Sequence, residues 1–347
     1  MRRLDQIEAT GSHREVGYAI GRRFAERIHQ ALDGYAFLQK QLLPYHHSEQ
    51  GQAAYREFLE LHWARYPNYL AELEGLAEGA GRSFEELFLV NLRGEYAGTL
   101  RQARTGCFDC VLVTGGTALI GHNEDAAPSF EGKTYLVRAQ IRGKPGFAAV
   151  CYPGFLPGNA FGFNRAGVCF SVDNVRPKGV RVGIGRHFLA RSLLEARSLR
   201  DAIDRITISG RASGFGYSIG SVPEGRVVYV ETAPEAHHVV EVRGWYVHAN
   251  HYRELATVEQ IVAESSRSRV EKACALLRKN PAPDTASVRS ILGDQGDEVY
   301  PIFRTARAPD ALMTLHTALF DLEARQLEIY SGHPSRESGL DTELTLA

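Results

Sequence analysis

Long apolar runs are missing from this sequence: no window approaches the roughly 18 consecutive apolar residues that a membrane-spanning helix needs. The N-terminal segment Met-Arg-Arg-Leu-Asp-Gln is polar overall, and no apolar run follows it. Cysteine is scarce as well, with five in 347 residues, an odd number in a chain that is long enough to bury a core without disulfides. These absences argue against a membrane-spanning protein and a disulfide scaffold, and we expect a cytoplasmic protein.

An excess of charge of either sign is also missing, because 40 basic side chains against 41 acidic ones leave a formal net charge of −1. Proteins that bind nucleic acid or anionic lipid usually carry a basic excess. With 44% hydrophobic and 23% charged residues, the composition is that of an ordinary globular protein. We therefore expect a small-molecule substrate, no nucleic-acid partner and no membrane partner.

The sequence has no internal repeat, low-complexity tract or linker that would divide it, so we expect one globular unit. After a short strand-like start before Gly11, the first hundred residues have mostly helical patterns, with capping signals at Ser12 and Ser83. From Phe108 onward, short strands separated by Gly and Pro dominate. We expect helices at residues 14–43, 56–63, 67–81, 83–96, 186–196, 199–206, 267–278 and 286–292. We expect strands at residues 111–114, 118–121, 135–141, 147–152, 168–172, 216–222, 227–232, 238–242, 245–249, 313–321 and 326–331. This order favours an α+β protein with antiparallel sheets layered with helices over a Rossmann arrangement.

The character of the chain changes at residues 105–110, Thr-Gly-Cys-Phe-Asp-Cys, and Cys107 is the first candidate for a catalytic residue. Gly106 has no side chain to block a thiol that folds back onto its carbonyl, and its backbone can adopt the strained conformation that this attack requires. Hydrolysis of the resulting ester would cut the chain before Cys107 and free an α-amino group of pKa near 8 beside a thiol of pKa about 8.5. One residue could then supply both the nucleophile and its base.

Residues 107–110 also have the C-x-x-C spacing of redox and zinc motifs. A redox motif of this kind begins a helix, but a β-branched strand follows here. A structural zinc site needs a second ligand pair, which Cys151, Cys169 and Cys274 do not form. His248 and His251 lack the carboxylate-histidine helix motif of metalloproteases. We therefore expect neither a metal nor a cofactor.

Polar residues that follow predicted strands are the other candidates. Asp125 ends the segment Gly-His-Asn-Glu-Asp, and a hairpin of this length can bring it back beside the start of the first strand, where it could hold the amine of a processed Cys107. The alternative is a loop with surface acids. Asn174 ends the strand at residues 168–172, and Asn250 follows another strand. Each is either a turn residue or a hydrogen-bond donor of an oxyanion hole.

Ser266 and Arg267 begin a predicted helix. They are either a cap with solvated cations or an anion contact near the site, and the sequence alone leaves both interpretations open.

Taken together in this order, these residues resemble the acyl-coenzyme A:6-aminopenicillanate acyltransferase family of N-terminal-nucleophile (Ntn) hydrolases, which is related to bile salt and penicillin V acylases. The Gly106-Cys107 junction and the Asn-x-Asp pattern that ends at Asp125 are the most specific parts of the resemblance. It also covers residues 11–21, 69–81, 85–87, 91, 121–125, 164–174, 250–251, 266–267 and 314–334.

The resemblance implies a four-layer αββα sandwich of two antiparallel sheets, and a precursor that cuts itself before Cys107. Residues 1–106 would be a helical propeptide or small chain and residues 107–347 the catalytic chain, with the two fragments remaining associated. Cys107 would be nucleophile and base, and Asp125 would position its amine. Asn250 would provide an oxyanion-hole side chain, assisted by Asn174.

Arg267 is similar to a family arginine near the nucleophile, although Arg269 fits the short motif nearly as well. Glu124 and Ala126 stand where some relatives carry tryptophans, which leaves the acyl substrate open. The resemblance implies an enzyme that cleaves a small-molecule acyl-amide, or transfers its acyl group to an amine, through a cysteine thioester. An acyl-thioester is a further possible donor.

Two alternatives remain open. One is an uncleaved Ntn-like protein that binds a small molecule. The other is a thiol hydrolase that pairs Cys107 with a histidine, such as His122 or His251.

Overall fold

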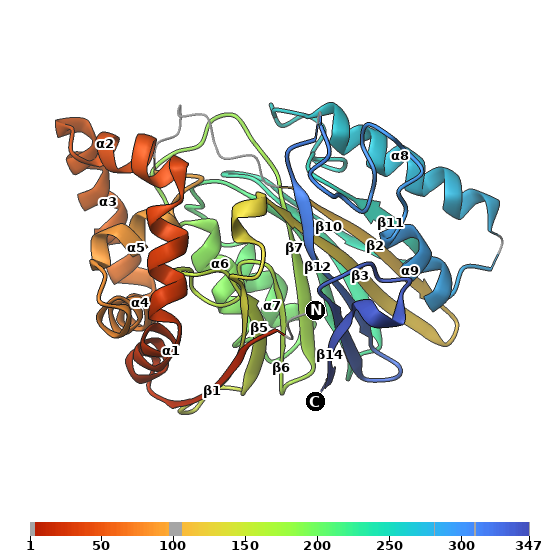
Figure 1. Ribbon diagram of the computed structural model, residues 1–347, viewed down its shortest axis with the longest axis horizontal. Helices are drawn as coiled ribbons and strands as arrows, with labels where there is room; N and C mark the ends of the chain where they lie inside the picture. Colours follow the sequence, from red (N-terminus) through yellow and green to blue (C-terminus); the bar gives the residue numbers. More distant parts are fainter. Residues whose placement is uncertain (1–3, 97–105, 281, 309, 347) are drawn as a thin grey trace.

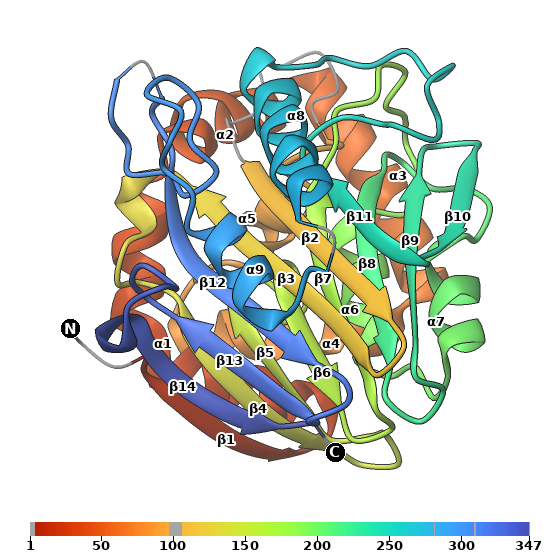
Figure 2. The ribbon, with the colours of Figure 1, turned by 90° about the vertical axis from the view of Figure 1, so that its right-hand side faces the viewer.

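Two β-sheets packed face to face form the centre of the protein, in a computed structural model that describes residues 4–96, 106–280, 282–308 and 310–346 (Figures 1 and 2). Helices α1 (His13–Asp33), α6 (Arg186–Leu193) and α7 (Leu199–Ile206) cover the outer face of one sheet. Helices α8 (Glu264–Lys279) and α9 (Thr285–Leu292) cover the outer face of the other. The α+β class and the αββα layering predicted from the sequence are confirmed.

The strands of each sheet come from distant parts of the chain. The eight-stranded sheet has the order β1 (Gln6–Gly11), β4 (Tyr135–Ile141), β5 (Phe147–Cys151), β6 (Phe161–Asn164), β7 (Val168–Asn174), β8 (Phe215–Ser221), β9 (Arg226–Thr232) and β10 (His237–Glu241). The six-stranded sheet has the order β11 (Gly244–His248), β2 (Gly106–Thr114), β3 (Thr117–Ala126), β12 (Met313–Asp321), β13 (Gln326–Tyr330) and β14 (Leu340–Thr345).

Described neighbours in both sheets pair antiparallel, as predicted, except β1 and β4, which run parallel from Gln6 opposite Leu136 to Gly11 opposite Ile141. A parallel pair needs a long crossover connection. Here the whole helical N-terminal part of the chain lies between β1 and β4 in sequence. The first strand of the chain therefore belongs to a sheet made mainly by later residues.

The N-terminal helices begin largely where the capping signals predicted. Ser12 forms a capping box for α1, Ser83 caps α5 (Phe84–Asn91), and Gly81 ends α4 (Pro67–Ala80) with a left-handed φ of 65°. The single helix predicted for residues 14–43 was too long, because α1 is capped at Gly34. After this break come the π-helix η1 (Leu38–Leu42), α2 (Leu43–His46) and α3 (Glu49–Arg65).

Two strands were missed. β6 lies between the predicted strands at residues 147–152 and 168–172, and β14 lies after the last predicted strand. The helix predicted for residues 83–96 ends at Asn91, and α8 starts three residues earlier than predicted, at Glu264. Of the segment preceding Cys107, residues 97–105 lie outside the described ranges, as do residues 1–3 at the N-terminus. Within those ranges, none of the helices has the length and apolar character to span a membrane.

Candidate active site

The open end of the β2–β3 hairpin carries the candidate site. In its register, Gly106 lies opposite Asp125 and Cys107 opposite Glu124. Side chains alternate between the two faces of a strand, so neighbours in sequence point in opposite directions. The face that holds Cys107 and Glu124 turns toward the eight-stranded sheet, because Val111 on the same face joins the core between the sheets. Asp125 therefore points the other way, toward the layer that contains α8.

On the face between the sheets, the Cys107 thiol lies against a carboxylate. Its Sγ is 3.6 Å from Oε2 of Glu124, and only 4% of Cys107 is exposed. The second oxygen of Glu124 accepts a hydrogen bond of 2.6 Å from the Tyr152 hydroxyl. Burial raises the pKa of the Cys107 thiol, and the negative charge of Glu124 raises it further. In the intact chain the thiol is therefore protonated at neutral pH.

His122 connects this carboxylate to a second one. Its Nε2 lies 3.1 Å from Glu124 Oε2, and its Nδ1 lies 2.6 Å from Oδ1 of Asp109, its cross-strand partner. Burial by itself lowers the pKa of His122, but the Asp109 charge and hydrogen bond outweigh it and the pKa is raised well above the usual value. His122 is thus an imidazolium between two carboxylates. Asp109 also accepts hydrogen bonds from Ser171 and Ser218 of the opposite sheet.

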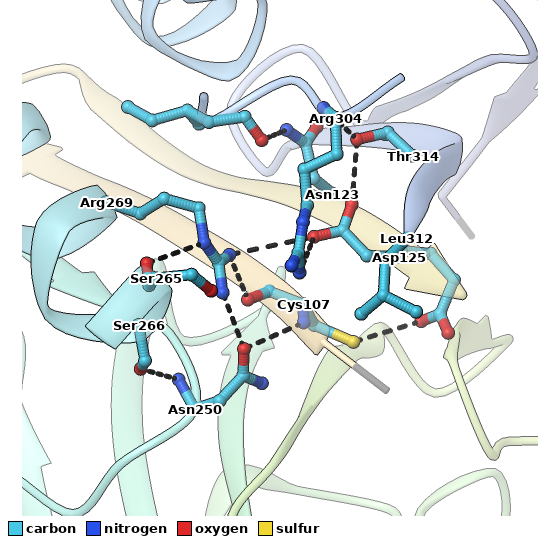
Figure 3. Close-up of polar contacts among 12 residues, drawn as sticks. Cys107, Asn123, Asp125, Asn250, Ser265, Ser266, Arg269, Arg304, Leu312 and Thr314 are labelled. Atoms are coloured by element: carbon cyan, nitrogen blue, oxygen red, sulfur yellow. Dashed lines mark hydrogen bonds and ion pairs between the residues drawn. The ribbon is translucent and has the colours of Figure 1, made fainter. Parts of the chain in front are cut away.

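Asn250 and Arg269 hold the backbone of Cys107 (Figure 3). The backbone N–H of Cys107 donates to Asn250 Oδ1 at 3.3 Å, and Arg269 donates to the same oxygen at 2.7 Å. Arg269 also donates to the Cys107 carbonyl oxygen at 2.8 Å. Asn250 Nδ2 donates to the Asn174 carbonyl oxygen at 2.9 Å. Because two donors face the amide oxygen and an acceptor faces the amide nitrogen, the network fixes the orientation of Asn250.

Asp125 is surrounded by cations on the helix-covered face (Figure 3). Its Oδ2 lies 3.3 Å from Arg304 and 3.6 Å from Arg269, and Thr314 donates to its Oδ1 at 2.7 Å. Burial raises the pKa of Asp125 above its usual range, although both guanidinium groups oppose the rise. The hairpin brings Asp125 to the start of β2, opposite Gly106. Its role in holding a Cys107 amine stays a prediction.

The two candidate arginines of α8 have different positions. Arg267 is exposed, whereas Arg269 is 1% exposed and contacts Cys107, Asn250 and Asp125. Residues two apart on a helix point about 200° apart, so only one of the pair can face the sheet. The structure thus places Arg269, and not Arg267, beside Cys107. The first choice among the two was wrong in position.

Sequence reasoning missed two groups beside the predicted residues. Arg304, an isolated cation in a loop, pairs with Asp125 across 179 positions and carries no local motif. The other is the hydrogen-bonded set of Glu124, His122 and Asp109, which lie at strand spacing on one face. The sequence analysis named His122 as a possible partner of Cys107 but did not predict that it links the two acids. Extending the predicted strands through polar residues at alternate positions would have predicted this second group. The predicted strands stopped short of these polar residues, while β2 and β3 run through them.

The spacing of these side chains also suits a metal ion. The ligand atoms of Cys107, His122 and Glu124 lie within 4.8 Å of one another, as do those of Asp109, His122 and Asp173. Both sets depend on His122. A metal ligand must be a neutral imidazole, whereas His122 lies between two carboxylates that raise its pKa well above the usual value. The arrangement fits a hydrogen-bonded proton chain better than a metal centre.

Comparison with known proteins places this geometry in a family. The family model described as acyl-coenzyme A:6-aminopenicillanic acid acyl-transferase matches residues 112–336. A β-alanyl-dopamine/carcinine hydrolase of Drosophila melanogaster is 31% identical over 358 residues, covering 94% of this chain and 92% of the relative. The 40 kDa form of the acyl-coenzyme A:6-aminopenicillanic-acid-acyltransferase of Emericella nidulans is 27% identical, covering 71% of this chain and 68% of the relative.

Among solved structures, an N-acylethanolamine-hydrolyzing acid amidase ortholog of Caenorhabditis elegans is similar with a TM-score of 0.42 and 12% identity. The similarity covers 70% of this chain and 100% of the other. This structural likeness is distant, so the assignment depends on the sequence matches. The chain belongs to the acyl-coenzyme A:6-aminopenicillanic acid acyl-transferase family, a family of acyl-amide hydrolases and acyltransferases.

Proposed function

We propose that this protein is a self-processing cysteine amidase or acyltransferase that cuts its own chain between Gly106 and Cys107 and then uses the new N-terminal Cys107 as its nucleophile. The observation that supports this most directly is the position of Cys107 at the start of β2, with its N–H and C=O held by Asn250 and Arg269. Because both backbone polar groups of Cys107 are held, its position is fixed, which suits an accurate attack of its thiol on the Gly106 carbonyl.

In the processed enzyme, the α-amino group of Cys107 would take the thiol proton, and the thiolate would attack the carbonyl of an acyl-amide. An amide nitrogen carries two hydrogens, and Asn250 Nδ2 donates one to the Asn174 carbonyl. The second is available to the oxyanion of the tetrahedral intermediate, together with a backbone N–H. The leaving amine would receive a proton from the Cys107 α-ammonium. Water would then complete hydrolysis of the thioester, or a second amine would complete transfer.

The two fragments would remain one unit after cleavage. β1 is hydrogen-bonded along its length to β4, and apolar residues of α1, including Val16, Ile20 and Ile28, are buried in the main core. Separating residues 1–106 from residues 107–347 would expose this surface to water, at roughly 25 cal/mol for each Å² of apolar area. The helical segment is thus a permanent part of the proposed enzyme.

For substrates, we propose a small-molecule acyl-amide, with an acyl-thioester as a second possible donor, and neither a nucleic-acid nor a membrane partner. The names of the Drosophila and Emericella relatives supply the first compounds to test: β-alanyl-dopamine and carcinine, and acyl-coenzyme A with 6-aminopenicillanate. We also propose a cytoplasmic location. The five cysteines are all buried and free, which suits a reducing compartment.

The decisive experiment is the intact mass of the purified full chain under denaturing conditions, with Cys107→Ala as the blocked variant. Cys110→Ala is the matched control, because Cys110 is a buried cysteine of the same strand that points to the opposite face. We expect fragments 1–106 and 107–347 from the wild type and Cys110→Ala, and a single chain from Cys107→Ala. A wild type that stays uncut after prolonged incubation would refute self-processing.

One observation favours a second candidate, an uncleaved thiol hydrolase. Cys107, His122 and Glu124 place their side-chain atoms within 4.8 Å of one another, whereas His251 bonds to Ser266 instead. An uncut chain with amidase activity that is lost in both Cys107→Ala and His122→Gln would support this candidate.

A further inference from the structure

Self-cleavage poses a chemical problem that later turnover does not. In the precursor, the nitrogen of Cys107 is part of the Gly106-Cys107 peptide bond, so it cannot accept the thiol proton. The thiol is buried beside a carboxylate and is protonated at neutral pH. The first cut therefore needs another proton acceptor within reach of Sγ. The inference that follows rests on the proposed self-processing, which by itself does not say which residue is this acceptor.

Among the described residues, the carboxylate nearest the thiol in the hydrogen-bond network is Glu124. Its Oε2 accepts the contact from Cys107 Sγ at 3.6 Å, and 6% of the residue is exposed. The register sets this contact, because Cys107 and Glu124 are direct cross-strand neighbours on one face. Tyr152 and His122 hold the carboxylate from its other sides.

The neighbouring groups are poorer acceptors. His122 lies between two carboxylates as an imidazolium and has no lone pair to offer. Asp125 is on the opposite face of the hairpin and is paired with Arg304 and Arg269. Asp109 lies two residue pairs deeper along the hairpin, and it already accepts hydrogen bonds from His122, Ser171 and Ser218.

We propose that Glu124 is the catalytic base of the self-cleavage step. Glu124 Oε2 takes the proton from Cys107 Sγ, and the sulfur forms a bond to the carbonyl carbon of Gly106. The proton passes from the Glu124 carboxyl to the Cys107 nitrogen as the C–N bond breaks, which leaves a thioester and a free α-amine. Water then hydrolyses the thioester to a Gly106 carboxylate and restores the Cys107 thiol.

His122 and Asp109 act as positioning residues in this proposal. The chain of hydrogen bonds runs from Glu124 through His122 to Asp109 and ends on Ser171 of β7 and Ser218 of β8. These serines belong to the eight-stranded sheet, whereas Cys107 belongs to the other. The base is thus fully assembled only when the two sheets have packed together, so the cut would follow folding and not precede it.

The test follows the rate at which freshly refolded precursor is cut, measured by intact mass after denaturing quench, in the wild type, Glu124→Gln and Glu124→Asp. We expect Glu124→Gln to be at least about 100-fold slower, the usual scale of a lost general base. Its remaining rate should rise with pH, because hydroxide must replace the carboxylate. Glu124→Asp keeps a carboxylate and should retain the pH profile of the wild type at a reduced rate. Glu86→Gln, which removes a largely buried carboxylate of α5, is the matched control and should cut at the wild-type rate.

The outcomes separate the two proposals. An uncut wild type refutes self-processing itself. A wild type and a Glu124→Gln variant that cut at the same rate refute the role of Glu124 and leave self-processing in place. If Glu124→Gln shows no cooperative urea unfolding, Glu124→Asp decides, because a wild-type rate or a shifted pH profile in that variant contradicts the proposal.

Discussion

The two faces of the β2–β3 hairpin carry opposite electrostatic arrangements within one residue of each other. On the inner face, Glu124 meets a thiol, a tyrosine hydroxyl and an imidazolium. On the helix-covered face, the adjacent Asp125 meets Arg269 and Arg304. Cys107 contacts both faces: Arg269 donates a hydrogen bond to the Cys107 carbonyl oxygen, and the Cys107 thiol contacts Glu124.

This difference shows how strand alternation gives two consecutive acids separate surroundings. Asp125 is balanced by buried cations, so its main physical effect is to keep the arginines in place near the Gly106-Cys107 junction. Among the described residues, the groups that contact the Glu124 carboxylate are the Cys107 thiol, the Tyr152 hydroxyl and the His122 imidazolium. The following predictions test whether the two faces differ in this way, from the largest expected effect to the smallest.

Replacing Asp125 by Asn should cost about 3–5 kcal/mol of unfolding free energy, because it leaves the buried guanidinium of Arg269 without its carboxylate. Urea unfolding in the Cys107→Ala background, where we expect a single chain, would measure the loss. Asp204→Asn, at an exposed position on α7, should change stability by less than about 0.5 kcal/mol. Equal losses of unfolding free energy in the two variants would show that the paired charges on the helix-covered face do not stabilise the fold.

On the inner face, stability should fall as pH rises from 6.5 to 9. Burial lowers the pKa of His248, but hydrogen bonds to Asp173 and Glu231 overcome this and raise it to about 9. A group with a raised pKa stabilises the fold fully below its unfolded value of 6.5 and loses that contribution as pH passes through the folded value. The shift corresponds to roughly 3 kcal/mol. Urea unfolding across this range should show the fall in the wild type and a smaller one in His248→Gln. An equal fall in both would exclude His248 as its source.

The two arginines of α8 offer a direct contrast. Arg269→Gln should lose about 2 kcal/mol and slow self-cleavage, because the hydrogen bonds to the Cys107 carbonyl and to Asn250 depend on the guanidinium. Arg267→Gln, at an exposed position, should stay within about 0.5 kcal/mol of the wild type and cut at its rate. Urea unfolding and intact mass measure the two effects. A strong effect of Arg267→Gln alone would reverse the assignment.

The smallest effect concerns the support of Asn250. Ser266 accepts the Asn250 backbone N–H at 2.7 Å, and its hydroxyl lies 2.7 Å from His251 Nδ1. Ser266→Ala leaves this buried donor unpaired and should cost about 1 kcal/mol. Ser265→Ala, in the same helical turn, serves as the control and should be near neutral in urea unfolding. The expectation is refuted if the two variants are equally stable.

Much of the layering followed from local patterns. Capping signals at Ser12 and Ser83 located helix starts, and apolar alternation located most strands to within a few residues. The predictions that were too short for β2 and β3 have one cause in common. Residues such as Asp109 and His122 are polar but fully buried, so hydrophobic alternation ended the predicted strands too early. Their burial is possible only because cross-strand and cross-sheet partners satisfy them.

The candidate nucleophile, its glycine neighbour, most of the helix and strand order and the family could be predicted from the chain alone, because they depend on residue types and short spacings. Which acid contacts the thiol, which arginine binds the backbone and which cation pairs with Asp125 became visible only in the folded protein. These contacts are set by strand register, by the face of a helix and by a loop 179 residues away from Asp125. A one-residue change in register would exchange the positions of Glu124 and Asp125, and no local pattern specifies that choice.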